Sequence, residues 1–109
     1  MTDQQQQAAA ALLDAALRTP EDDLPGILVF DGRDAYLAFV TVWKGRHAAQ
    51  VSEIRRLKAI RRDKSESVAT RNAAQERRQG HRGASHALQV IRRAGKDVAR
   101  AARESRLAA

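Results

Sequence analysis

The middle of the chain carries a stripe of mostly apolar side chains at helical spacing. Its members are alternately four and three residues apart, as on one face of an α-helix. The stripe runs through Tyr36, Val40, Trp43, His47, Gln50, Ile54 and Leu57, and Phe39 and Val51 widen it. It keeps its phase past Gly45. The spacing predicts one long helix from about residue 32 to residue 62 or beyond, with roughly three coiled-coil-like heptads.

The start of this helix has a second interpretation. Residues 31–34 could instead form the loop of a β-hairpin over residues 27–43, and the β-branched segment Val40-Thr41-Val42 favours a strand. The same loop residues suit a helix N-terminus, with Asp31 as N-cap and Asp34 in the first turn. Because alternating strand residues have no reason to keep a helical phase, helix is favoured and the β-hairpin stays the alternative.

A shorter helix is predicted over residues 4–18. Asp3 can cap its N-terminus, and Pro20 ends it by restricting the residue before it. An acidic linker with a proline and a glycine follows over residues 21–26. Residues 27–30 are apolar throughout, and we expect them to form a short buried strand or extended segment.

The last third of the chain contains a glycine-flanked break followed by an amphipathic helix. Residues 80–83 have the composition of a loop, and Ser85 can cap a helix of about residues 85–107. Apolar residues repeat along that helix with a period of 3.6, and small residues lie at the centre of the face. Residues 61–79 are polar but compatible with helix.

These elements predict an all-α protein with a short N-terminal helix, a long central helix and a basic C-terminal helix. The arrangement is a helical hairpin or a coiled-coil-like oligomer. We expect two regions, an acidic one with the central packing helix over residues 1–62 and a basic helical one over residues 63–109. The chain has 22 alanines, which bury little apolar area. Because small helical proteins with thin cores often self-associate, we also expect a homo-oligomer.

Charge changes sign near the middle of the chain. Residues 1–54 hold four basic and eight acidic residues, a balance of −4, whereas residues 55–109 hold sixteen basic and five acidic residues, a balance of +11. A segment with so much like charge repels itself when compact unless an anion lies beside it. The pattern therefore favours a nucleic-acid partner, DNA or RNA, held through its backbone phosphates.

The candidate phosphate contacts gather in two basic runs, one at the end of the central helix and one on the last helix. Cationic side chains three or four residues apart share a helix face, so a row of them can contact successive phosphates. The candidates are Arg55, Arg56, Arg61, Arg62, Arg92, Arg93, Lys96, Arg100 and Arg103. The sequence thus predicts a small non-enzymatic nucleic-acid-binding protein.

The aromatic and aliphatic stripe supports an alternative function. Its candidate packing or oligomer surface consists of Tyr36, Phe39, Val40, Trp43, His47, Ile54 and Leu57. In this alternative, the surface binds a protein target, and the basic half of the chain binds an acidic partner. Small, cysteine-free chains rich in Ala and Arg are typical of accessory proteins of phages and mobile elements, which is an analogy of composition.

The sequence gives little support for an enzyme, a metal-binding protein or a membrane protein. No nucleophile–base spacing, phosphate-binding loop or dinucleotide motif is present, so we expect no catalytic residue and no cofactor. Two histidines, His81 and His86, are too few to predict a metal site. The chain has no cysteine and no apolar run of about 18–20 residues, so we expect a cytoplasmic protein without membrane contact.

Overall fold

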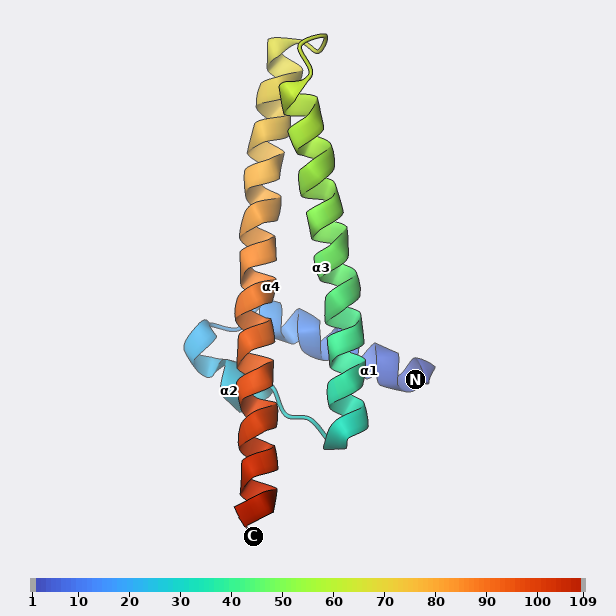
Figure 1. The fold of residues 1–109 in the computed structure, drawn as a ribbon, viewed down its shortest axis with the longest axis vertical. Coiled ribbons are helices and arrows are strands. Elements are labelled where there is room, and N and C mark those ends of the chain that lie inside the picture. Colours follow the sequence, from blue (N-terminus) through green and yellow to red (C-terminus); the bar gives the residue numbers. More distant parts are fainter. Residues whose placement is uncertain (1, 109) are drawn as a thin grey trace.

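The computed structural model describes residues 2–108, and every regular element in that range is helical. The elements are α1 (Asp3–Leu17), the 3₁₀ turn η1 (Glu21–Asp23), α2 (Leu24–Ile27), α3 (Gly32–Arg62) and α4 (Val68–Ala108). Helices α3 and α4 run antiparallel and form a long hairpin (Figure 1). The prediction of an all-α hairpin is therefore confirmed.

The central helix has the bounds that its apolar stripe predicted. Helix α3 is 31 residues long and passes through Gly45 without interruption. Residues 32–43 belong to its first three turns, so the alternative of a β-hairpin over residues 27–43 is wrong. Asp31 occupies the N-cap position, but its side chain makes no capping hydrogen bond. Gly32 has a φ of 85°, which a residue with a Cβ adopts only with strain.

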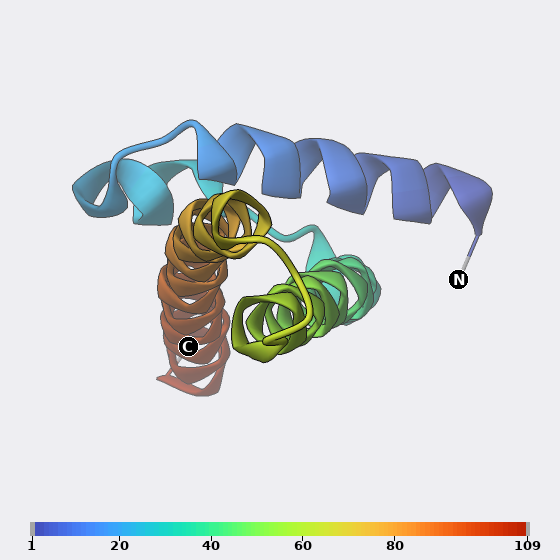
Figure 2. The ribbon, with the colours of Figure 1, turned by 90° about the horizontal axis from the view of Figure 1, so that it is seen from above.

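The N-terminal helix lies across one face of the hairpin and contacts both of its arms (Figure 2). Its cap is Thr2 and not Asp3, because Thr2 Oγ1 accepts from the Gln5 backbone N–H while the Gln5 side chain accepts from the Thr2 backbone N–H. Asp3 is instead the first helical residue, where its carboxylate suits the helix dipole. Leu13 faces the hairpin and is fully buried.

The core sits where α1, the linker and the hairpin meet. It comprises Ala9, Leu13, Ala16, Leu24, Leu28, Ala38, Phe39, Leu88 and Ile91. The rest of the hairpin, toward its turn, is a two-helix arm with Leu57 and Ala74 as its buried apolar residues. The molecule is consequently elongated, with extents of 63 × 30 × 20 Å.

The linker between α1 and α3 contains a helical turn, mostly within the predicted acidic linker of residues 21–26, and of the predicted strand or extended segment over residues 27–30 only Ile27 is helical. Leu24 and Leu28 are four residues apart and both fully buried, which one turn of helix (α2) allows. The backbone N–H of Leu28 donates to the carbonyl oxygen of Leu24 at 2.9 Å. Residues 27–30 therefore do not form a strand. The continuous apolar run reflects a short helix that packs on α4, followed by an irregular segment whose Phe30 lies beside Gly95 of α4.

The break before the last helix lies at residues 63–67, and the prediction of a break at Gly80–Gly83 is wrong. Helix α4 runs continuously for 41 residues from Val68. Asp63 Oδ1 accepts from the backbone N–H of Ser65 at 3.0 Å, and Ser67 Oγ accepts from the backbone N–H of Thr70 at 3.1 Å. These two bonds end one helix arm and start the next. Ser85 is therefore inside a helix and not at its cap.

Candidate nucleic-acid interface

The stripe that was predicted as a packing or oligomer surface lies between α3 and α4 of the same chain. Phe39, Val40 and Leu57 are buried, and Tyr36, Trp43, His47 and Ile54 are half-buried. In the structure, α4 of the same chain therefore covers this surface. A homo-oligomer and a protein-binding role both stay predictions, and each needs a surface other than this stripe.

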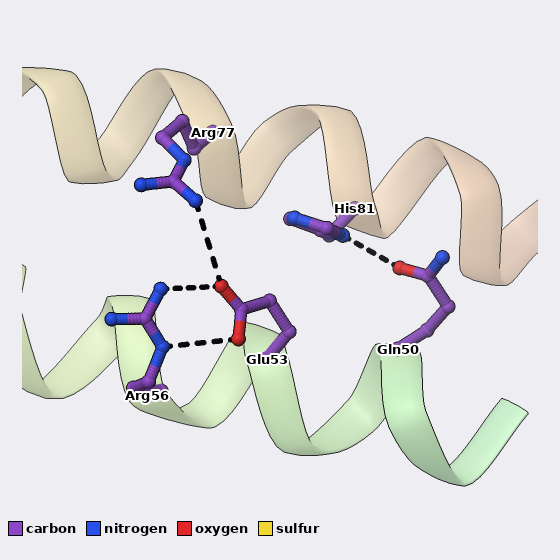
Figure 3. Close-up of polar contacts among 5 residues, drawn as sticks. All are labelled: Gln50, Glu53, Arg56, Arg77 and His81. Atoms are coloured by element: carbon purple, nitrogen blue, oxygen red, sulfur yellow. Dashed lines mark hydrogen bonds and ion pairs between the residues drawn. The ribbon is translucent and has the colours of Figure 1, made fainter. Parts of the chain in front are cut away.

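Polar contacts cross the hairpin alongside the apolar ones. The Trp43 indole N–H donates to the carbonyl oxygen of Leu88 at 2.6 Å, and the His47 ring stacks on Trp43 with centroids 4.7 Å apart. Nearer the turn, His81 Nδ1 lies 2.7 Å from Gln50 Oε1 (Figure 3). These contacts explain why His47 lies on the predicted packing surface, and they place His81, which was assigned to the predicted break, against α3.

One predicted phosphate ligand, Arg92, points into the hairpin. Its guanidinium donates to Tyr36 Oη at 3.0 Å. The same group lies 6.0 Å from the Tyr36 ring centroid and 5.7 Å from that of Trp43. Because the cationic head contacts two aromatic rings and a hydroxyl, Arg92 contributes to packing. Its neighbour Arg93 is exposed.

The other predicted cations of the last helix form one exposed row. Arg93, Lys96, Arg100 and Arg103 are spaced by three, four and three residues, so they share one side of α4. We call these four residues the α4 surface. The last ten residues of the described chain, 99–108, are almost entirely exposed, so the end of this row projects into solvent.

A second group of cations surrounds the hairpin turn. Arg61 and Arg62 end α3, and Lys64 follows in the turn. All three are exposed, and we call them the tip surface. Arg55 is exposed about two turns earlier on α3. At about 1.5 Å per residue, more than about 35 Å of α4 separates the tip surface from the α4 surface.

Few carboxylates neutralise the basic half. Within residues 2–108, only three of its sixteen basic residues lie within 4.0 Å of a carboxylate. Arg56 and Arg77 share Glu53, with Arg77 Nη2 at 3.8 Å from Glu53 Oε1 (Figure 3). Arg100 pairs with Asp97 at 3.0 Å. The hydrogen bond from Arg56 lowers the pKa of Glu53. Glu53 is thus the single acidic residue of the first half that pairs with the second half in this range.

The remaining carboxylates are engaged elsewhere or exposed. Asp14 of α1 pairs with Arg46 of α3, and this hydrogen bond lowers the pKa of Asp14. Glu21, Asp22 and Asp23 are exposed in η1. The opposite charges of the two halves are therefore not matched to each other, and the excess positive charge remains at the surface.

The phosphate contacts predicted from the sequence leave out two cations near the α4 surface. Arg33, at the start of α3, and Arg106, in the last turn of α4, line one pocket with Lys96, Arg100 and Arg103. Arg33 escaped notice because it belongs to the acidic half. Its position beside the C-terminal helix depends on the antiparallel hairpin, which the stripe of α3 predicted only as one of two arrangements.

Comparisons with protein-family models, with curated proteins and with solved structures returned no match. Among residues 2–108, no helix combines the length and the apolar character that crossing a bilayer requires. In the same range, no three His, Asp or Glu side chains lie close enough together to hold one metal ion.

Proposed function

We propose that this protein binds nucleic acid without base specificity and without catalysis, through backbone phosphates. The phosphates would contact the tip surface (Arg61, Arg62, Lys64) and the α4 surface (Arg93, Lys96, Arg100, Arg103). Arg55, and Arg56 beside Glu53, extend the first set. Arg92 is not included, because its guanidinium contacts Tyr36 and Trp43. A cytoplasmic location belongs to the same proposal.

The observation that carries this proposal is the unpaired charge of the basic half. Its balance is +11, and thirteen of its sixteen cations have no carboxylate within 4.0 Å in the described range. Like charges at this density favour a polyanion, since each phosphate contact also releases condensed counterions. The 63 Å length of the molecule would span roughly 18 base pairs at ~3.4 Å per pair.

The proposal is tested by charge reversal on the α4 surface. The double variant R93E/K96E is titrated with a fluorescent 30-base-pair DNA duplex at 50 mM salt, and anisotropy is recorded. We expect the affinity to fall by about tenfold or more, since two attractive contacts become repulsive. Both residues are exposed, so circular dichroism should show an unchanged helix content.

The matched control is R18E/K44E, which changes the net charge by the same amount in the acidic half. Both control residues are exposed. If the proposal is correct, the control loses much less affinity than R93E/K96E. Equal losses would mean that overall charge alone attracts DNA, and no binding of the unaltered protein at 50 mM salt would overturn the proposal.

A further inference from the structure

A half-open pocket lies at the end of the hairpin that is farthest from its turn. Here α4 continues beyond the start of α3, so its last turns have no helical partner on that side (Figure 1). The pocket has a volume of about 670 Å³. This is within the range of roughly 300–1,000 Å³ that small-molecule sites occupy.

The rim of the pocket is cationic. Arg33 comes from the first turn of α3, and Lys96, Arg100, Arg103 and Arg106 come from α4. No carboxylate lines the pocket, and Arg100 is the only one of the five within 4.0 Å of a carboxylate in the described residues, through Asp97. Five positive groups around one opening form a site for an anion.

Helix dipoles account for one of these cations and not for the others. Arg106 lies in the last turn of α4, where a positive side chain is favoured. Arg33 lies in the first turn of α3, where the positive end of the dipole makes a cation unfavourable. An anion bound at this end of α3 would remove that repulsion.

The floor of the pocket is aromatic and aliphatic. Phe30 and Tyr36 meet edge to face with centroids 5.1 Å apart, and both are half-buried. Val98 and Ala102 of α4 line the pocket with them. The Tyr36 hydroxyl oxygen accepts from Arg92, whose guanidinium also lies 6.0 Å from the ring centroid, and the hydroxyl keeps its own proton to donate to a ligand. Aromatic rings beside cations are the combination on which a nucleobase and its phosphate bind together.

We infer that this pocket binds a single nucleotide, with the phosphate at the cationic rim and the base against Phe30 and Tyr36. The nucleotide has two sources, a free nucleotide or the unpaired end of a strand. The second source rests on the proposed function, whereas the first does not. The shared chemistry is a phosphate joined to a flat ring.

The test compares two alanines that are adjacent in α4. Ala102 lines the pocket and Ala101 does not, and both are exposed. A102E adds a carboxylate to the pocket, and A101E adds the same charge beside it. Binding of AMP, adenosine and inorganic phosphate is measured by calorimetry at 50 mM salt. We expect AMP to bind at least about tenfold more tightly than either fragment, A102E to lose about tenfold, and A101E to stay within about twofold.

A second experiment distinguishes the two sources of the nucleotide, a free nucleotide and the unpaired end of a strand. Blunt 30-base-pair duplex is compared with the same duplex carrying unpaired five-nucleotide ends. If the strand is the source, the unpaired ends raise the affinity, and A102E removes that gain while blunt-duplex binding persists. If a free nucleotide is the source, the two duplexes bind alike and AMP binding still depends on residue 102.

The inference is overturned if the unaltered protein neither binds AMP nor distinguishes the two duplexes. It is also overturned if A101E and A102E lose AMP equally, or if inorganic phosphate binds as tightly as AMP. Failure of the proposed function has a different signature, which is absence of blunt-duplex binding at 50 mM salt while AMP binding remains.

Discussion

The indole N–H of Trp43 donates a hydrogen bond to the backbone carbonyl oxygen of Leu88, with a nitrogen-to-oxygen distance of 2.6 Å. The bond joins α3 to α4 beside the core, where Leu88 is buried. The same indole is stacked on His47 and lies near the Arg92 guanidinium. Trp43 therefore links the two arms of the hairpin through a directional contact as well as through buried area.

Replacing this indole separates the two contributions. Trp43→Phe keeps an aromatic ring and removes the donor, so the free energy of unfolding should fall by about 0.5–1.5 kcal/mol from the hydrogen bond, plus some lost area. Trp43→Ala should cost about 3–5 kcal/mol. Urea denaturation followed by circular dichroism measures both. A Trp43→Phe variant as stable as the unaltered protein would show that the hydrogen bond contributes nothing.

Of the two neighbouring arginines, Arg92 should contribute mainly to stability and Arg93 mainly to DNA binding. Arg92→Ala removes the hydrogen bond to Tyr36 and the packing of the side-chain stem, and we expect a loss of about 1–2 kcal/mol in the free energy of unfolding. Arg93→Ala, at an exposed position, should change stability by less than about 0.5 kcal/mol and weaken duplex binding instead. The prediction is wrong if both variants behave alike in urea denaturation and DNA titration.

The sequence predicted those parts of the fold in which apolar side chains recur with a regular helical period. The stripe from Tyr36 to Leu57 predicted α3 because a buried face repeats every three or four residues. The continuity of α4 was not predictable in the same way. Two glycines each cost about 1 kcal/mol relative to alanine in a helix, yet His81 between them contacts Gln50 of α3. Tertiary contacts there override local preference.

The true turn had a signal that was passed over. Asp63, Ser65 and Ser67 are residues whose side chains hydrogen-bond to nearby backbone groups, and two of them do so here. The sequence predicted which types of residue form the candidate site, but not the directions in which their side chains point. Arg92 and Arg93 are equivalent in sequence, and only the approach of Tyr36 from α3 distinguishes them.

Helix continuity through the glycines gives a stability prediction. A Cβ added at Gly80 or Gly83 would meet no atom within 4 Å, and neither glycine has a positive φ. Gly80→Ala and Gly83→Ala should each raise the free energy of unfolding by about 0.5–1 kcal/mol. Gly32→Ala is the control, since its φ of +85° makes an alanine strained and should lower stability. If the glycines formed a loop with positive φ, thermal denaturation would show losses for all three.

Acidic pH should weaken the ion pairs of Glu53, which join it to Arg56 within α3 and to Arg77 of α4. The hydrogen bond from Arg56 lowers the pKa of Glu53 in the folded state, so the unfolded chain binds a proton first as the pH falls. The stabilisation is therefore complete above about pH 4.5 and is lost as the pH falls through the lower folded value. Denaturation of the Glu53→Gln variant between pH 2 and pH 7 should show a weaker dependence on pH than the unaltered protein. Identical pH profiles would contradict this assignment.

The central claim is that the unpaired cations of the basic half bind backbone phosphates, and salt dependence measures it most directly. Anisotropy titrations of the 30-base-pair duplex at 50, 100 and 200 mM salt give the slope of log affinity against log salt. If six to ten phosphates are contacted, the affinity should fall by roughly 10³–10⁵ across this range. An affinity that changes by less than about threefold would contradict the account, because phosphate contacts release counterions and cannot be insensitive to salt.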